Sequence, residues 1–140
     1  MIWFKEVSVE QAQARGKGTM MEHIDVQITE IGPDYVKATM PVDSRTKQPR
    51  GILHGGASVV LAEGIASMAG NFVLNPETHY AVGLDINANH IRSVTEGRVE
   101  GTARPLHIGR KTQVWEIKIE QESKLICISR LTLAVLEKKL

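Results

Sequence analysis

The run Gly-Ile-Leu-His-Gly-Gly-Ala-Ser at residues 51–58, together with the apolar stretch that follows it through about Phe72, decides the fold of this chain. Its glycines allow a tight turn and let the backbone approach a ligand closely. Residues 57–73 contain no lysine, arginine or proline, and Glu63 is their single charged residue. Because a helix that is apolar on nearly every side is a buried helix, we expect a long central helix that begins at the glycines.

Glu63 is the first candidate for chemistry, since burial would place its carboxylate where water is scarce. Ser67 and Asn71 follow it at intervals of four residues, so all three share one helical face. A buried carboxylate is costly unless it is paired, hydrogen-bonded or protonated, and a structural acid that caps a neighbouring element is the alternative. His54 and the glycines favour chemistry, because they add a second titratable group and free amides at a helix N-terminus, where partial positive charge gathers.

Length, charge and cysteine content bound the class of protein. A chain of 140 residues suits one domain, residues 1–140, and its net charge of +1 argues against a general nucleic-acid surface. Cys127 is the single cysteine, which excludes an internal disulfide and is typical of a reducing compartment. The first residues lack a signal-peptide pattern, and no apolar run is long enough to span a membrane. We therefore expect a cytoplasmic protein with neither nucleic-acid nor membrane partners.

Hydrophobic periodicity predicts an α+β layer arrangement. We expect a short helix at residues 8–14 with Ser8 as its N-cap, an extended stretch at 23–30, and a half-buried strand at 35–42. Four further strand-like stretches follow the central helix, at about residues 79–90, 96–106, 111–121 and 125–136. The last is apolar on both faces, which predicts an inner strand buried on two sides. An antiparallel sheet of five or so strands that packs on the helix accounts for this order.

Two polar clusters that contain basic residues, at 87–93 and 105–111, stand near the ends of consecutive strands. If those ends meet, the clusters form a rim able to bind phosphate; two solvated strand ends with ordinary surface charge are the alternative. A metal site is not expected, because His54 and Glu63 are nine residues apart rather than at the four-residue spacing of a helical zinc pair.

The run Gln-Pro-Arg at residues 48–50, continued by the glycine turn, by Leu-Ala-Glu at 61–63 and by Ser-Met-Ala-Gly at 67–70, resembles the hotdog-fold acyl-CoA thioesterases. The likeness extends to residues 1–3, 40–46, 87–90 and 105–110, and so covers nearly the whole chain. The branch it looks most like contains the bacterial thioesterases of menaquinone biosynthesis and of enterobactin proofreading. The resemblance implies hydrolysis of an acyl-CoA thioester with an aromatic acyl group, and no cofactor beyond the coenzyme A of the substrate.

On the same resemblance, the fold class is α+β: a hotdog fold in which an antiparallel sheet of about five to six strands wraps a long central helix. Two chains join their sheets into a homodimer, usually within a dimer of dimers, a homotetramer. Active sites of the family lie at the dimer interface, so the residues of one site come from two chains.

The resemblance also assigns roles to positions that match the family's motifs. Glu63 is the catalytic carboxylate, which either attacks the thioester carbonyl or activates a water as general base, and the sequence leaves both open. The amide of Gly55 polarises the thioester oxygen. His54 and Gln48 position the thioester or the water, and Ser67 orients the acid or the water from across the interface. The implied contacts to coenzyme A are Val82, Asn89, His90, Arg92, Ser93, His107, Gly109 and Arg110.

The chain differs from the family pattern at Arg50, and two functions other than thioester hydrolysis are also possible for it. Arg50 stands near the acyl pocket where the relatives often carry an aromatic residue, so the acyl preference can differ. Dehydration of hydroxyacyl thioesters would need a His54–Glu63 pair to move a proton on the acyl chain. A non-catalytic dimer that only binds acyl-CoA is the other alternative, and the presence of Glu63 argues against it, because an unpaired buried acid is an unneeded cost in a binding pocket.

Overall fold

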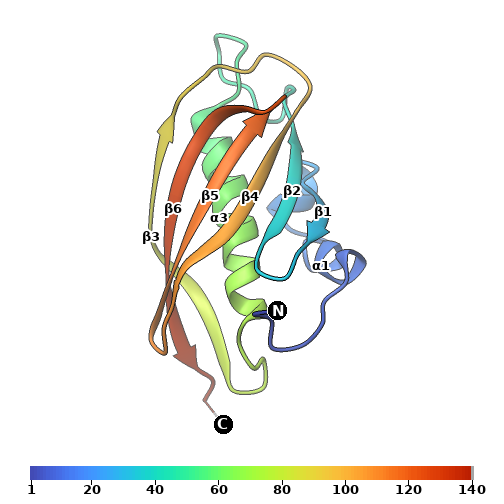
Figure 1. Ribbon diagram of the computed structural model, residues 1–140. Helices are drawn as coiled ribbons and strands as arrows, with labels where there is room; N and C mark the ends of the chain where they lie inside the picture. Colours follow the sequence, from blue (N-terminus) through green and yellow to red (C-terminus); the bar gives the residue numbers. More distant parts are fainter. Residues whose placement is uncertain (140) are drawn as a thin grey trace.

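One antiparallel sheet curves around one long helix (Figure 1). The structure is a computed structural model that describes residues 1–139. Its elements are α1 (Val9–Arg15), α2 (Met20–His23), β1 (Gln27–Ile31), β2 (Val36–Pro41), α3 (Gly55–Phe72), β3 (His79–His90), β4 (Arg98–Ile108), β5 (Thr112–Gln121) and β6 (Lys124–Glu137). Within the described range, six strands form the sheet in the order β1-β2-β4-β5-β6-β3. The α+β class and the sheet that wraps a central helix are therefore confirmed.

One face of α3 packs tightly on the sheet. Leu61 and Ile65 are fully buried there, and the sheet comes close because β4 carries Gly101, where an added Cβ would lie 3.1 Å from Cδ1 of Ile65. The other face is only half-buried at Glu63 and Ser67. The expectation of a helix buried on every side is wrong for the single chain, because only α2 and the end of α1 reach this second face.

The residues before α1 close the C-terminal end of α3. The Trp3 ring stacks on Trp115 with 6.5 Å between ring centroids and meets Phe72 edge-on at 6.3 Å. The Phe4 N–H donates to the carbonyl of Phe72 at 2.8 Å. Aromatic burial and main-chain bonding thus tie the N-terminal segment to the helix.

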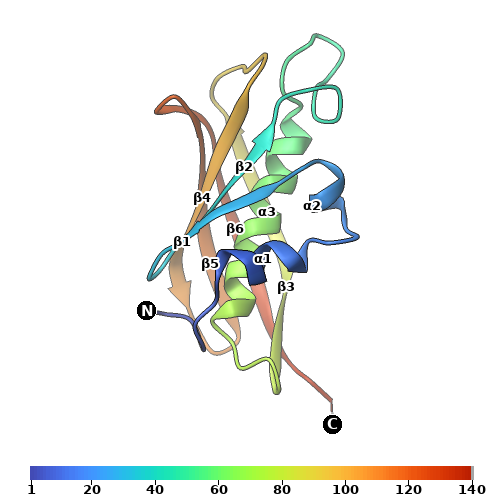
Figure 2. The same ribbon diagram turned by 90° about the vertical axis from the view of Figure 1, so that its right-hand side faces the viewer.

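α1 is fixed by its cap and by β1. Ser8 and Gln11 form a reciprocal capping box, which confirms Ser8 as the N-cap. The Gln13 side chain donates to the carbonyl of Val26 at 3.1 Å and accepts from the N–H of Ile28 at 2.7 Å. These bonds hold α1 against the start of β1, while Arg15 at the end of α1 and the following α2 contact α3 (Figure 2).

The four strands predicted after the central helix are confirmed as β3 to β6, with small shifts at their ends. The extended stretch predicted at 23–30 starts later, because Thr19 caps α2 and His23 belongs to that helix. β6 is an inner strand as predicted, but its burial on two sides is wrong for the single chain: Ile128 and Thr132, on its convex face, are half-exposed. Cys127 is fully buried and burial raises the pKa of its thiol, which fits a packing role.

None of the helices within residues 1–139 is both long and apolar enough to cross a membrane.

Candidate active site

The loop that leads into α3 is fastened on both sides of the glycine turn. The His54 N–H donates to the carbonyl of Thr46 at 2.8 Å, and the Leu53 N–H donates to that of Val94 at 2.8 Å. Thr46 is itself buried and donates its hydroxyl to the carbonyl of Pro41 at 2.7 Å. Gly51 has a φ of 79°, a left-handed conformation that favours glycine. The turn therefore delivers the start of α3 as a rigid unit.

A short ion pair stiffens the same loop. The Arg45 guanidinium donates to the Asp43 carboxylate, with 2.6 Å between Nη2 and Oδ2. This hydrogen bond lowers the pKa of Asp43 to about 2. Both side chains are exposed, so the pair shapes the loop more than it stabilises the protein.

His54 caps α3 and leaves one amide free. Its Nδ1 accepts from the N–H of Gly56 at 2.8 Å, so the neutral ring carries its hydrogen on Nε2. Within the described residues the N–H of Gly55 finds no hydrogen-bond acceptor. A free first-turn amide at the positive end of an 18-residue helix can bind a developing negative charge.

This amide opens into a hollow of about 320 Å³. Predicted site residues that line it are Gln48, Gly55, His90, Arg92 and Ser93. The His90 ring lies directly on the helix start, since a Cβ at Gly55 would be 2.7 Å from Nε2 of His90. The structure therefore brings two predicted catalytic residues together with three of the predicted coenzyme A contacts.

Glu63 and Ser67 lie further along α3, in a second hollow that Arg15, Met68 and Asn71 also line. The Glu63 carboxylate points at β3, where it contacts the space that a side chain at Gly83 would fill. Among the residues that the structure describes, this carboxylate has neither an ion pair nor a hydrogen-bond donor. Asn71 ties α3 to β3: it accepts from the N–H of Ala81 at 2.9 Å and donates to the carbonyl of the same residue at 3.1 Å.

One chain divides the predicted catalytic residues into two groups. We call Gln48, His54 and Gly55 the turn group, and Glu63 with Ser67 the helix-face group. Nine residues of helix separate His54 from Glu63, which is about 13 Å along the axis. The two groups of one chain therefore cannot act on the same carbonyl carbon.

The predicted meeting of the two basic clusters is wrong within one chain. His90 pairs with Cys127 of β6, whereas Thr112, just after the β4–β5 loop, pairs with Ala134. Seven residues along β6 separate the two places, about 24 Å. β4 runs antiparallel to β3, so the end of β4 with His107 and the following loop with Gly109 and Arg110 lie at the other end of the sheet (Figure 1).

Two further predicted coenzyme A contacts also stand apart. Val82 is 39% exposed and faces the opposite side of the sheet from Gly83, which faces Glu63. Asn89 is exposed beside His90 but, by the same alternation, points to the other face of β3. Neither side chain joins the hollow at the turn group in a single chain.

Sequence reasoning missed Arg15 and Gly83. Arg15 ends α1 and reaches the Glu63 hollow only because α1 packs beside α3, and Gly83 matters only because β3 passes the carboxylate. Neither residue has a local sequence signal. In the part of the chain that the structure describes, no three metal-ligating side chains lie together.

Comparison with known proteins gives a consistent family. Residues 50–128 match the family model of the Thioesterase superfamily. The chain is 53% identical over 137 residues to 1,4-dihydroxy-2-naphthoyl-CoA hydrolase of Escherichia coli, a match that covers 97% of this chain and 100% of that protein. It is 46% identical over 137 residues to the proofreading thioesterase EntH of Cronobacter sakazakii, covering 97% and 99%. A crystal structure of a Haemophilus influenzae thioesterase superposes with a TM-score of 0.94 at 47% identity, covering 98% of this chain and 96% of that one.

Proposed function

Because the chain belongs to the thioesterase superfamily and is an acyl-CoA thioester hydrolase with the hotdog fold, we propose that its acyl group is aromatic and that Glu63 is its catalytic carboxylate. The Escherichia coli relative is named for a substrate with a dihydroxylated naphthoyl group. We extend that aromatic class to this chain, and with it a place in menaquinone biosynthesis. No cofactor is required in this proposal, since coenzyme A belongs to the substrate.

One observation carries the catalytic assignment: among residues 1–139, the Glu63 carboxylate has no partner on an open helix face, and the Gly55 amide at the start of the same helix has no acceptor. The Gly55 amide would hold the thioester oxygen as negative charge develops on it. Glu63 would add to the carbonyl carbon, or take a proton from the water that adds. In the first route the C–S bond breaks as coenzyme A leaves, and water then hydrolyses the anhydride between Glu63 and the acyl group, which frees the acid and restores Glu63. In the second route the oxygen of the added water becomes part of the new acid as the C–S bond breaks. In both routes coenzyme A takes up a proton and leaves as the thiol.

A second copy of the chain is needed to complete this site. Proteins of this fold are generally oligomeric. Among residues 1–139 no strand pairs with the outer edge of β3, which exposes Val82 and Leu84 along its length. Such an edge favours pairing with another strand. We propose a dimer through β3 that sets the turn group of one protomer against the helix-face group of its partner, and a dimer of dimers from two such pairs.

The coenzyme A end of the substrate would lie on basic residues from more than one chain. His90, Arg92 and Ser93 line the hollow at the turn group, where a phosphate would meet a guanidinium and a hydroxyl. His107, Gly109 and Arg110 would have to come from another protomer, because they lie at the far end of the sheet. Asn89 and Val82 remain assigned to the same role on the resemblance alone.

The dehydratase alternative is weakened by the cap that His54 forms. Because about 13 Å of helix separates His54 from Glu63 in one chain, a dehydratase would also need the two residues from different protomers. His54 also uses Nδ1 to cap α3, which leaves one ring nitrogen for chemistry.

Thiol release from a panel of aryl, short-chain and long-chain acyl-CoA esters tests the proposed function. We expect kcat/KM to be highest for aryl esters. A higher value for long aliphatic esters would overturn the aromatic assignment, and no thiol release from any ester would overturn the catalytic one.

A further inference from the structure

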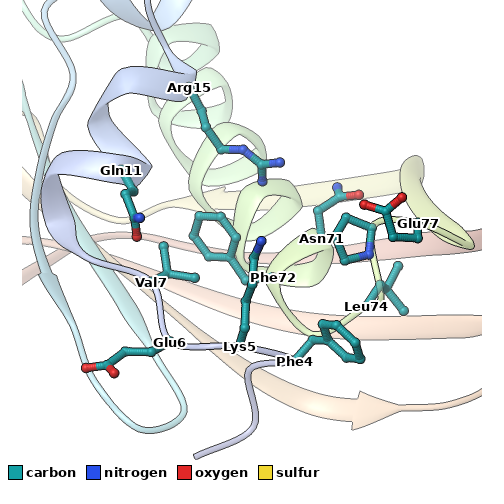
Figure 3. A pocket seen from close by; sticks show the side chains of 11 residues that line it. Phe4, Lys5, Glu6, Val7, Gln11, Arg15, Asn71, Phe72, Leu74 and Glu77 are labelled. Carbon is teal, nitrogen blue, oxygen red and sulfur yellow. The ribbon is translucent and has the colours of Figure 1, made fainter.

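A groove lies between the N-terminal segment and the C-terminal end of α3, beyond the residues assigned above (Figure 3). Its volume is about 410 Å³, and Phe4 and Phe72 belong to its apolar walls. Arg15 and Asn71 line both this groove and the hollow of Glu63, so the two spaces adjoin.

The groove continues in the direction that an acyl group would take from Glu63. Arg15 lines the hollow of Glu63 itself as well as the groove. An aryl acyl group whose carbonyl lies at Glu63, and whose ring points toward the end of α3, therefore has its far end on the side of the hollow that Arg15 lines. The half-buried side chain of Met68 lies along this path and suits an apolar ring.

Arg15 presents free hydrogen-bond donors at that far end. Its guanidinium carbon lies 5.2 Å from the centroid of the Phe72 ring, and Figure 3 shows the group directed into the groove between α1 and α3. Within residues 1–139 no carboxylate lies within ion-pair distance of it. This cation–π contact keeps the guanidinium over the ring and leaves N–H donors for another partner.

The base of Arg15 is held firmly. Ala12 is fully buried, and Gln13 bonds to the main chain of Val26 and Ile28 at the start of β1, so the last turn of α1 has a fixed place beside α3. Specificity requires a donor that is already in position before the substrate arrives. A solvated arginine at a helix end meets this condition only when a neighbouring ring orients it, as Phe72 does here.

We propose that Arg15 determines substrate specificity by binding an oxygen substituent, a hydroxyl or a carboxylate, on the far side of an aromatic acyl group. The planar guanidinium offers paired donors that match such oxygens. The inference rests on the proposed function and names the class of acyl group that this site prefers: an aryl group with a polar oxygen at its outer end.

The test compares three substrates and three variants in the full-length enzyme. The substrates are benzoyl-CoA, 4-hydroxybenzoyl-CoA and 4-carboxybenzoyl-CoA, and the readout is the ratio of kcat/KM between each substituted ester and benzoyl-CoA. Arg15→Met keeps the apolar stem but removes the donors, Arg15→Lys keeps the charge without the fork, and Lys17→Met removes a nearby exposed cation as the matched control.

For Arg15→Met we expect at least one ratio to fall about tenfold or more, mainly through KM, since a hydrogen bond to a charged group is lost. Arg15→Lys should restore part of the ratio, and Lys17→Met should leave it unchanged. A fall confined to the hydroxyl ester, or to the carboxyl ester, supports the proposal and identifies the oxygen that is bound. Unchanged ratios in Arg15→Met would overturn the role of Arg15 while the thioesterase assignment stands. Absence of hydrolysis of all three esters by the unmodified enzyme would overturn both.

Discussion

The turn group and the helix-face group are built in opposite ways. The turn group rests on main-chain hydrogen bonds of the loop at 46–54, and its reactive part is a backbone amide at Gly55. The helix-face group rests on the side chain of Glu63, whose surroundings come from α1, α3 and β3. The half that we propose polarises the thioester is thus held by main-chain hydrogen bonds before substrate arrives, whereas the carboxylate of the other half has no partner among residues 1–139. The two halves should therefore respond differently to substitution.

The largest effect is expected where the free carboxylate is removed. Glu63→Gln should lower kcat by about 1,000-fold or more with a smaller change in KM, because in the proposed function the acid attacks the carbonyl carbon or activates the water that attacks it. Steady-state thiol release measures this, with Glu10→Gln on the exposed face of α1 as the matched control. Near-normal turnover in Glu63→Gln would show that the acid lies outside the chemistry.

One methyl group added to the turn group, at Gly55, should lower kcat clearly. Gly55→Ala places a Cβ 2.7 Å from Nε2 of His90, so the ring or the helix start must move. Displacing an oxyanion donor costs about 100-fold in kcat in other enzymes, and we expect a loss of that order. Thermal unfolding should show the variant still folded; a folded Gly55→Ala with full kcat would contradict the role of this amide.

A glycine-to-alanine substitution beside the helix-face group should lower kcat less than the one at Gly55. Gly83→Ala puts a Cβ against the Glu63 carboxylate, but that side chain has no fixed partner among the described residues and can rotate away. We expect a fall in kcat of about tenfold, smaller than for Gly55→Ala. Steady-state kcat of the two variants is compared on one substrate. A larger fall in kcat for Gly83→Ala than for Gly55→Ala would show that the helix-face group, and not the turn group, is the rigid one.

The smallest effect is expected from removing the charge of Arg92, which lines the hollow at the turn group. Arg92→Ala should raise KM about fivefold for coenzyme A thioesters and less for pantetheine thioesters, which lack the nucleotide phosphates. Lys118→Ala, an exposed cation on the outer sheet face, is the control. Equal changes on both substrates would count against a phosphate contact.

Features that depend on neighbours along the chain could be predicted from the sequence, whereas features that depend on tertiary packing could not. Alternation in 111–121 and the glycines before α3 are local signals, and both elements form where they were predicted. The capping box at Ser8 is local in the same sense. By contrast, the place of Arg15 depends on how α1 packs, and the expected union of the two basic clusters failed because strand direction, rather than order along the chain, decides which ends meet.

The burial of Glu63 also depends on packing rather than on local sequence. The apolar sequence of α3 predicts a helix covered on all sides, whereas the single chain buries one face fully and the other only in part. A second protomer packed on the half-exposed face would account for that sequence, because it would bury apolar side chains that the single chain leaves partly in water. The pattern in α3 is thus the one expected if a second protomer, as proposed above, packs on this face.

Co-expression of two inactive variants tests most directly whether the two groups meet across an interface. Glu63→Gln in one chain and Gln48→Ala with His54→Ala in the other are combined, and the purified mixture is assayed for thiol release. If a site joins the two protomers, each mixed dimer has one intact site, and random pairing restores about one quarter of normal activity. If a site lies within one chain, every site carries a lesion and the mixture stays as inactive as its parents, which would contradict the account.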